Sequence, residues 1–216
     1  MRLVYMNPNS TQSMTQSIVE VARLEAPQID IIGITNVDGP AAIQGPDDGD
    51  LAVVGLMRLL DEARDLKADV IVIACFDDTG LDALRARAHC PVLGIGQSAY
   101  ATAQLLGVRF SVVTSLAVSV PVIEHNIKST GFGPNCTSVR ASGLPVLAID
   151  AGGQDVLQRL SDEIDAAVKD DAAQAVVLGC AGMAPLRDAL AANSTVALID
   201  GVAASVHLAQ VAARFA

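Results

Sequence analysis

The chain has 216 residues, 51% of them hydrophobic and 18% charged, and it carries a formal net charge of −10 at pH 7. This length and composition exclude a disordered chain and fit either one large domain or two small ones. Nucleic acids and anionic membranes bind through clustered lysines and arginines. Because no such cluster occurs in the sequence, we expect neither as a partner.

The first residues show no sign of an export signal. The sequence passes from Met1 to the polar stretch NPNST at residues 7–11, which leaves no room for the apolar segment of a signal peptide. The four cysteines, at positions 75, 90, 136 and 180, form neither a CxxC pair nor the dense pattern of a disulfide-rich secreted protein. We therefore expect reduced thiols and a cytoplasmic protein.

Short runs rich in Val and Ile alternate with longer helical patterns along the whole chain. This alternation predicts βα units around mostly parallel sheets. The expected strands are residues 2–6, 29–34, 70–74, 92–95, 109–114, 137–141, 175–179 and 196–199. The expected helices lie near residues 11–25, 49–67, 80–88, 97–106, 117–130, 153–170, 184–192 and 201–214.

The two halves of the sequence resemble each other when one is shifted by about 105 to 107 residues against the other. Cys75 then falls on Cys180, and Asn7 falls on Thr114. The expected fold is therefore α/β, with two pseudo-symmetric parallel-sheet domains and the active site in the cleft between them. We assign residues 1–96 plus 201–216 to the first domain and residues 97–200 to the second.

Cys75 and Cys180 each follow an apolar strand and precede a helical pattern. Ligands of open α/β sheets bind at the carboxyl ends of the strands, so the two thiols are expected to face each other across the cleft. A single cysteine in such a place is most often only a small buried hydrophobe. The repetition favours a shared function for this pair, whereas Cys90 and Cys136 have no such match.

Two opposed thiols suit the inversion of a carbon acid. The N–H groups and positive dipole end of a helix lower the pKa of a nearby thiol, so a thiolate is expected near neutral pH. The thiolate removes a proton from one face of the carbon, and the thiol on the other face returns one, without any cofactor. Backbone N–H groups could hold the oxygen that becomes negative, and the candidates are Phe76, Asp77, Ala181, Gly182 and Met183.

Several motifs together carry a family resemblance, namely NPNST, GPAAIQG, ACFDDTGL, PVLGIGQSA, RFSVVTSL, SVR, VLGCAGM and IDGVAA. With them the chain resembles, over essentially its whole length, the hydantoin racemase branch of the aspartate/glutamate racemase superfamily. The resemblance implies a cofactor-independent racemase of 5-substituted hydantoins or allantoin, and a homo-oligomer. By the same resemblance Cys75 and Cys180 are the acid/base thiols, and the residues around the substrate ring are Asn7, Ile43, Phe76, Thr114, Gly182 and Met183.

The chain departs from the pattern of that family at two places. The family typically reads Phe-Gly-Asp-Pro-Gly after the first cysteine, where this chain has Phe-Asp-Asp-Thr-Gly at residues 76–80. Asp77 is also a candidate substrate-binding residue. If its carboxylate points toward Cys75, its negative charge would oppose the formation of the thiolate. The alternative is that Asp77 or Asp78 caps a helix. The second departure is Ala42 and Gln44, where Ser and Glu are common.

Other functions remain open from the sequence. Amino-acid racemases of the superfamily usually carry Asn-Thr after the first cysteine and Thr-His after the second, but this chain has Phe-Asp and Ala-Gly there. A neutral cyclic imide is therefore favoured over glutamate or aspartate. A non-catalytic binding protein of the same fold and a thiol redox pair are further alternatives. We expect no metal site, because His89, His125 and His207 lack the spacing of metal ligands.

Overall fold

Two four-stranded parallel sheets form the framework of the protein, as a computed structural model describing residues 1–216 shows. The first sheet has the order β2-β1-β3-β4, with β1 Arg2–Asn7, β2 Asp30–Thr35, β3 Val70–Ile73 and β4 Val92–Gly94. The second has the order β6-β5-β7-β8, with β5 Phe110–Thr114, β6 Cys136–Ala141, β7 Ala175–Gly179 and β8 Ala197–Asp200. The shared strand order confirms the predicted α/β class and its internal repeat.

Nine α-helices and three 3-10 helices connect and cover the strands. The first part of the chain contains α1 Gln12–Glu25, α2 Pro46–Asp65, α3 Leu81–Arg85 and α4 Ile95–Leu105. The remainder contains η1 Ala117–Ser119, α5 Val120–Ser129, η2 Gly133–Asn135, α6 Val146–Ala151, α7 Gln154–Asp170, η3 Ala181–Leu186, α8 Arg187–Ala191 and α9 Gly201–Phe215. No helix combines the length and the apolar character that a membrane span needs.

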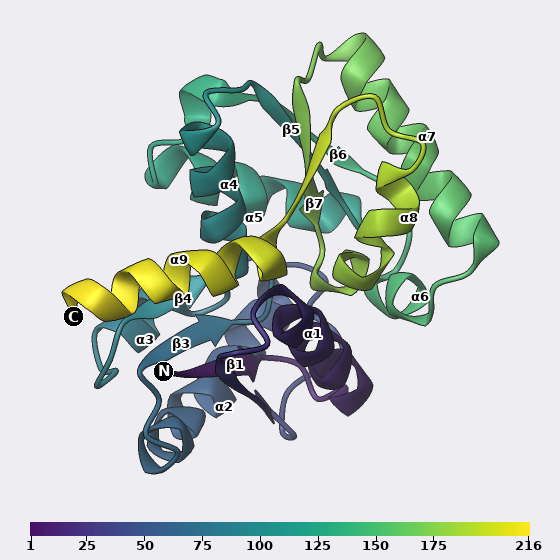
Figure 1. Cartoon of the computed structure of the whole chain (residues 1–216). Helices are drawn as coiled ribbons and strands as arrows, with labels where there is room; N and C mark the ends of the chain where they lie inside the picture. Colours follow the sequence, from purple (N-terminus) through teal and green to yellow (C-terminus); the bar gives the residue numbers. More distant parts are fainter.

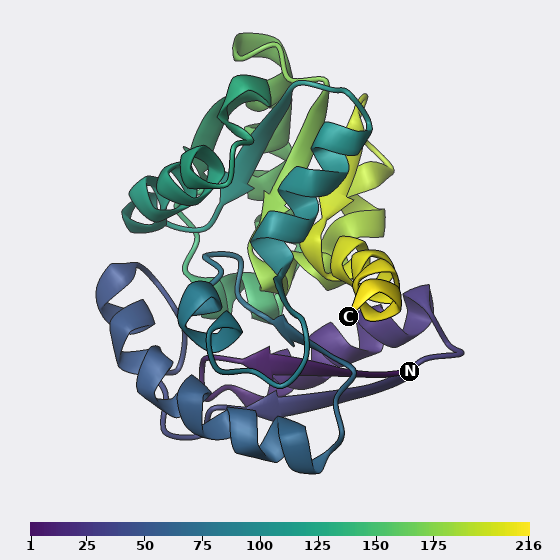
Figure 2. The same cartoon turned by 90° about the vertical axis from the view of Figure 1, so that its left-hand side faces the viewer.

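The central strands of both sheets are hydrophobic because helices cover both of their faces. Every residue of β3, β5 and β7 is buried, as parallel strands between two helical layers require. Tyr5 of β1 and Phe110 of β5 belong to one hydrophobic cluster that extends through both halves of the molecule. The two halves therefore share one core, in which helices such as α4 and α9 lie between the sheets, one sheet above the other in Figures 1 and 2.

The helix boundaries differ from the predicted ones where prolines or short segments decide them. The helix expected at 184–192 is a 3-10 helix from Ala181, with Pro185 inside it, followed by the short α8. Proline has no N–H for an α-helical hydrogen bond, which explains the late start of α8. The helix expected at 80–88 ends at Arg85, and α6 is not predicted, because one or two turns show too little periodicity.

The chain passes between the two sheets at the starts of α4 and α9, which pack closely on each other. In Figure 1, α9 runs between the upper and lower halves. A Cβ atom at Gly201 would lie 2.4 Å from the carbonyl oxygen of Ile95, so only glycine permits this approach. The Tyr5 hydroxyl, 2.7 Å from Ser205 Oγ, ties β1 to the same helix. We propose that the domains divide near residues 96 and 201, as expected from the repeat.

Replacing Gly201 by alanine is expected to lower the free energy of unfolding by about 1 to 3 kcal/mol, because the added methyl group forces α4 and α9 apart. Thermal unfolding followed by circular dichroism measures the change. Gly49→Ala in α2 is the matched control, since its nearest neighbour would be the Thr79 methyl group at 3.8 Å. Equal melting temperatures for the two variants would contradict the role of Gly201.

Candidate active site

The carboxyl ends of both sheets meet at one small cavity of about 30 Å³. Its walls come from the segments that follow β1, β3, β5 and β7, together with α1, α6 and the loop before α2. Both candidate cysteines line it. The lining residues are Asn9, Met14, Ile43, Ala74, Cys75, Phe76, Asp77, Thr114, Ser115, Ser119, Val146, Gly179, Cys180 and Ala181. The tertiary structure thus brings together two thiols from equivalent positions of the two sheets.

Equivalent turns hold the two cysteines, and both thiols are free. The Asp78 N–H donates to the carbonyl oxygen of Cys75 at 3.0 Å, and the Met183 N–H donates to that of Cys180 at 3.0 Å. In each turn the N–H of the second residue after the cysteine lowers the pKa of the thiol, from Asp77 in one half and Gly182 in the other. The sequence repeat therefore reproduces the same backbone hydrogen bonding beside both sulfur atoms.

Burial dominates the acidity of both thiols. It raises the pKa of Cys180 to about 12 and that of Cys75 further still, and the negative charge of Asp77 adds to both shifts. The N–H groups and the Thr79 hydroxyl, which donates to Cys75 Sγ at 3.4 Å, lower the pKa by less. Desolvation thus outweighs the N–H groups in this small cavity, and the pKa of each thiol is raised, where the sequence led us to expect a lowered pKa.

The two aspartates after Phe76 have different surroundings. The carboxylate of Asp78 accepts hydrogen bonds from the N–H groups of Gly96 and Gln97 at 2.9 and 2.7 Å, so it caps α4. Asp77 instead lines the cysteine cavity, where burial raises its pKa to about 7. Both alternatives from the sequence therefore occur: Asp78 caps a helix, and Asp77 lies beside the thiols.

Three further predicted residues, Ile43, Phe76 and Thr114, also line the cavity. The Thr114 hydroxyl donates to the carbonyl oxygen of Gly179 at 2.8 Å and so joins the ends of β5 and β7. The Phe76 ring packs edge-on against Tyr100, with ring centroids 5.5 Å apart. Ile43 is positioned by its neighbour Gln44, whose Oε1 accepts from the Val146 N–H of the other half at 3.0 Å.

The remaining predicted residues, Asn7, Gly182 and Met183, do not line the cavity. The side-chain amide of Asn7 donates to Asn9 Oδ1 and to Thr15 Oγ1, both at 2.9 Å, so it supports Asn9 from behind. Gly182 and Met183 act on Cys180 through their N–H groups, while the Met183 side chain is fully buried in the core. In this structure all three therefore lie behind the cavity wall, and their part in substrate binding stays a prediction.

Sequence reasoning missed several lining residues. Asn9 belongs to the same NPNST motif as Asn7, but only the fold shows that the second asparagine faces the cavity. Ser115 and Ser119 follow β5, and their position after a strand end is the one signal that could have indicated them. Met14 and Val146 come from helices and have no distinguishing pattern. They line the cavity because the fold brings α1 and α6, which are distant in sequence, to the same place.

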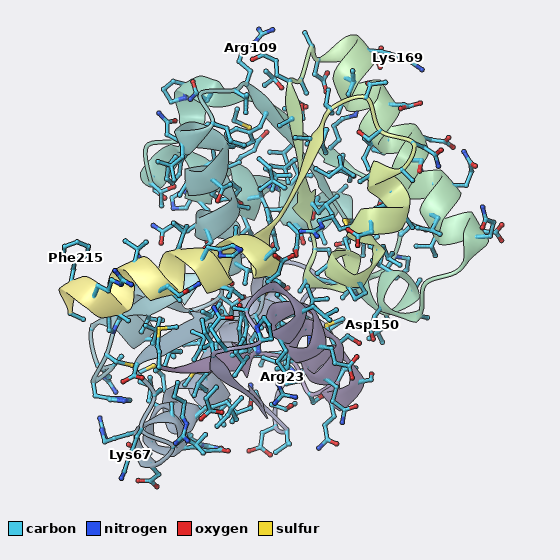
Figure 3. All side chains as sticks on the ribbon, in the orientation of Figure 1. Arg23, Lys67, Arg109, Asp150, Lys169 and Phe215 are labelled. Carbon is cyan, nitrogen blue, oxygen red and sulfur yellow. The ribbon has the colours of Figure 1, made fainter.

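The surroundings of the thiols are acidic. Besides Asp77, Asp150 of α6 raises the pKa of Cys180 through its charge. Asp150 lies where the two halves meet, near α1 (Figure 3). Burial raises the pKa of its carboxyl, and a hydrogen bond with Ser13 offsets only part of this rise. No group of three or more His, Cys, Asp or Glu side chains is placed to hold a metal ion. Negative charge, without a nearby cation, thus surrounds the two sulfur atoms.

Comparison with known proteins agrees with this geometry. Residues 3–209 match the family described as Asp/Glu/Hydantoin racemase. A hydantoin racemase from Rhizobium meliloti is 42% identical over 97% of this chain and 88% of its own length. The chain belongs to the Asp/Glu/hydantoin racemase family. The prediction of an isomerase of the racemase class is therefore confirmed.

Solved structures of this family share the fold in full. Allantoin racemase from Klebsiella pneumoniae matches with a TM-score of 0.94 and 34% identity, covering 100% of this chain and 88% of its own. Allantoin racemase from Pseudomonas fluorescens matches with a TM-score of 0.94 and 33% identity, covering 100% of this chain and 92% of its own. The predicted racemase fold is thus confirmed over the entire chain.

Asp77→Asn is expected to shift the alkylation of the cavity thiols by iodoacetamide to lower pH, by about half a unit or more, because it removes a like charge. The rate is measured from about pH 5.5 to 10 in a background lacking Cys90 and Cys136. The difference should shrink below pH 7, where Asp77 itself becomes protonated. Asp50→Asn is the control, and an equal shift there would show a general charge effect.

Proposed function

We propose that the chain racemises 5-substituted hydantoins or allantoin by proton transfer at ring carbon C5. The observation that supports this most is the presence of Cys75 and Cys180, from equivalent strand ends, in one cavity. The relatives named hydantoin racemase and allantoin racemase, at 42% and 34% identity, support the same substrate class.

The proposed reaction uses the thiols as a base and an acid on opposite faces of the ring. One sulfur, as thiolate, takes the C5 proton, and the electron pair of the C–H bond moves toward the ring carbonyl. The other thiol then gives its proton to C5 from the opposite face and becomes the thiolate. The net charge of the pair is unchanged, and the two sulfurs have exchanged roles, so the return reaction uses the same groups.

Burial of Cys75 and Cys180 has two opposite effects on catalysis: it lowers the fraction of thiolate and raises the basicity of the thiolate that forms. A thiol of raised pKa ionises rarely, but the thiolate that forms is a stronger base toward a carbon acid. The N–H groups of Asp77 and Gly182 stabilise the thiolate in each half. We propose that the N–H groups of Phe76 and Ala181, both in the cavity wall, hold the oxygen that becomes negative.

The proposed substrate-binding residues are Ile43, Phe76, Asp77 and Thr114, joined by Asn9. Asn7, Gly182 and Met183 support them in the ways described above. A cavity of about 30 Å³ has space for about one or two water molecules, so the ring enters only when the walls move apart. The loop that carries Ile43 is the proposed moving part, since one Gln44 hydrogen bond joins it to α6.

The amino-acid racemase alternative is less favoured by the charges of the site. Glutamate and aspartate carry carboxylates, whereas the thiols are already surrounded by Asp77 and Asp150 without a cation. A neutral ring avoids this repulsion. We also infer a cytoplasmic compartment from the four free thiols, and a homo-oligomer from the resemblance to the racemase family.

Cys75→Ser and Cys180→Ser are each expected to lower racemisation by about 100-fold to 10,000-fold or more, because serine is too weak a base. Each variant keeps one thiol and should exchange the C5 proton of only one enantiomer in heavy water. The two variants should label opposite enantiomers, as chiral chromatography with mass spectrometry would show.

Cys90→Ser and Cys136→Ser are the matched controls, since both cysteines lie outside the cavity and should leave racemisation unchanged. Spontaneous exchange of the hydantoin is subtracted in each case. Labelling of the same enantiomer by both cavity variants, or near-normal racemisation by either, would contradict the opposed-thiol mechanism.

Removal of metals is expected to leave racemisation unchanged, because thiols and backbone N–H groups supply both proton transfer and charge stabilisation. The rate is compared before and after dialysis against EDTA, with a metal-free buffer as control. Activity that disappears on dialysis and returns with an added divalent metal would overturn this expectation.

A further inference from the structure

A second, larger space adjoins the cysteine cavity. It is a groove of about 350 Å³ between the first turns of α2, the segment 77–80, the start of α3 and one face of α5. Ile43 and Asp77 line both the groove and the cysteine cavity. These two side chains therefore stand at the junction between the buried thiols and an open surface groove.

This junction is the route for any substituent on a ring held between the thiols. The cysteine cavity is too small for a ring and its side chain together, and its other walls are strand ends and core residues. The other large cavities of the molecule share no lining residue with it. A substituent at C5 thus extends past Ile43 and Asp77 into the groove.

The carboxylate of Asp77 is available to such a substituent. A hydrogen bond with Ser119 is the one interaction that lowers its pKa, and no cation pairs with it. Its backbone carbonyl oxygen accepts from Asn126 Nδ2 of α5 at 2.8 Å, which fixes the segment against the other half. The position of Asp77 is thus held by its backbone, while its side chain keeps acceptor capacity.

The rest of the groove does not neutralise this charge. Arg85 is its one cation, and the guanidinium donates to the carbonyl oxygen of Val92 at 2.9 Å and also to the side chain of Gln97. It also pairs with Asp82 at 3.9 Å. Asp50 contributes a further carboxylate, while that of Asp78 caps α4. The groove therefore presents net negative charge to whatever passes Asp77.

We propose that Asp77 selects the ring substituent, favouring C5 side chains that present N–H donors and excluding those that carry a carboxylate. This inference rests on the proposed function and names the substrate class within it. A donor side chain hydrogen-bonds to the Asp77 carboxylate, whereas a carboxylate side chain meets a like charge at a partly desolvated junction. The substrates concerned are hydantoins with amide, ureido, guanidino or amino side chains.

The test compares two substrates of the same shape, 5-(2-carbamoylethyl)hydantoin and 5-(2-carboxyethyl)hydantoin. At about pH 8.5, above the pKa of about 7 of Asp77, the wild-type protein should prefer the carbamoyl compound in kcat/KM by about tenfold or more. In Asp77→Asn the ratio should fall by about fivefold or more, because asparagine has no charge and can itself donate to a carboxylate. The ratio between two substrates cancels any general loss of activity in the variant.

Asp155→Asn on α7 is the matched control, since it removes one exposed negative charge that lines neither the groove nor the cysteine cavity, and it should keep the ratio. The neutral 5-(2-methylthioethyl)hydantoin separates the possible failures. If wild-type protein racemises it but shows no preference between the two test compounds, or if Asp77→Asn keeps the preference, the role of Asp77 is wrong. If wild-type protein racemises none of the three, the proposed function itself fails, and this inference with it.

Discussion

Burial of two thiols between the two halves is the constraint on which the rest of this structure depends. A thiol can act on a carbon acid only as a thiolate, and a closed cavity opposes the formation of that charge. The fold offsets part of this cost in the same way twice, by directing the N–H group two residues after each cysteine toward the sulfur. The halves must also stay in contact, which the shared core and the close approach of α4 and α9 at Gly201 ensure.

The two halves share the strand order and the turn hydrogen bond after each cysteine, but they differ in charge. By the alignment of the halves, Asp77 corresponds to Gly182 and Asp78 corresponds to Met183. Asp78 has a structural reason, since α4 has no side-chain cap of its own, whereas α9 is capped by its own Asp200. No structural need of that kind explains Asp77, which increases the repulsion at both thiols. The Asp77 charge destabilises the thiolates, and the side chain lies where the cysteine cavity adjoins the groove, so we explain it by substrate choice.

The strands could be predicted closely, because local patterns decide them. Each of the eight predicted strands agrees with the structure within one residue at either end. Fully buried strands such as β3 and β7 appear as short runs of Val and Ile, whereas the half-buried β6 was located by its place between two helical patterns. Short helices could not be predicted as well from the sequence. The 3-10 helix from Ala181 depends on Pro185 and on packing against α6, and α6 itself has only six residues. Asn9, rather than Asn7, faces the cavity because a network around Thr15 uses the amide of Asn7.

The sequence by itself determined the fold class, the repeat and the pair of cysteines, because strand periodicity and matched motifs are properties of neighbouring residues. Only the tertiary structure decided how those cysteines behave. The pKa of each thiol depends on its desolvation and on the charge of Asp77, and that of Cys180 depends also on Asp150, which lies far from Asp77 along the chain. The tertiary structure likewise decided that Asp78 caps α4 whereas Asp77 lines the cysteine cavity. Desolvation and electrostatic contact act through space, and a linear pattern does not contain the distances on which they depend.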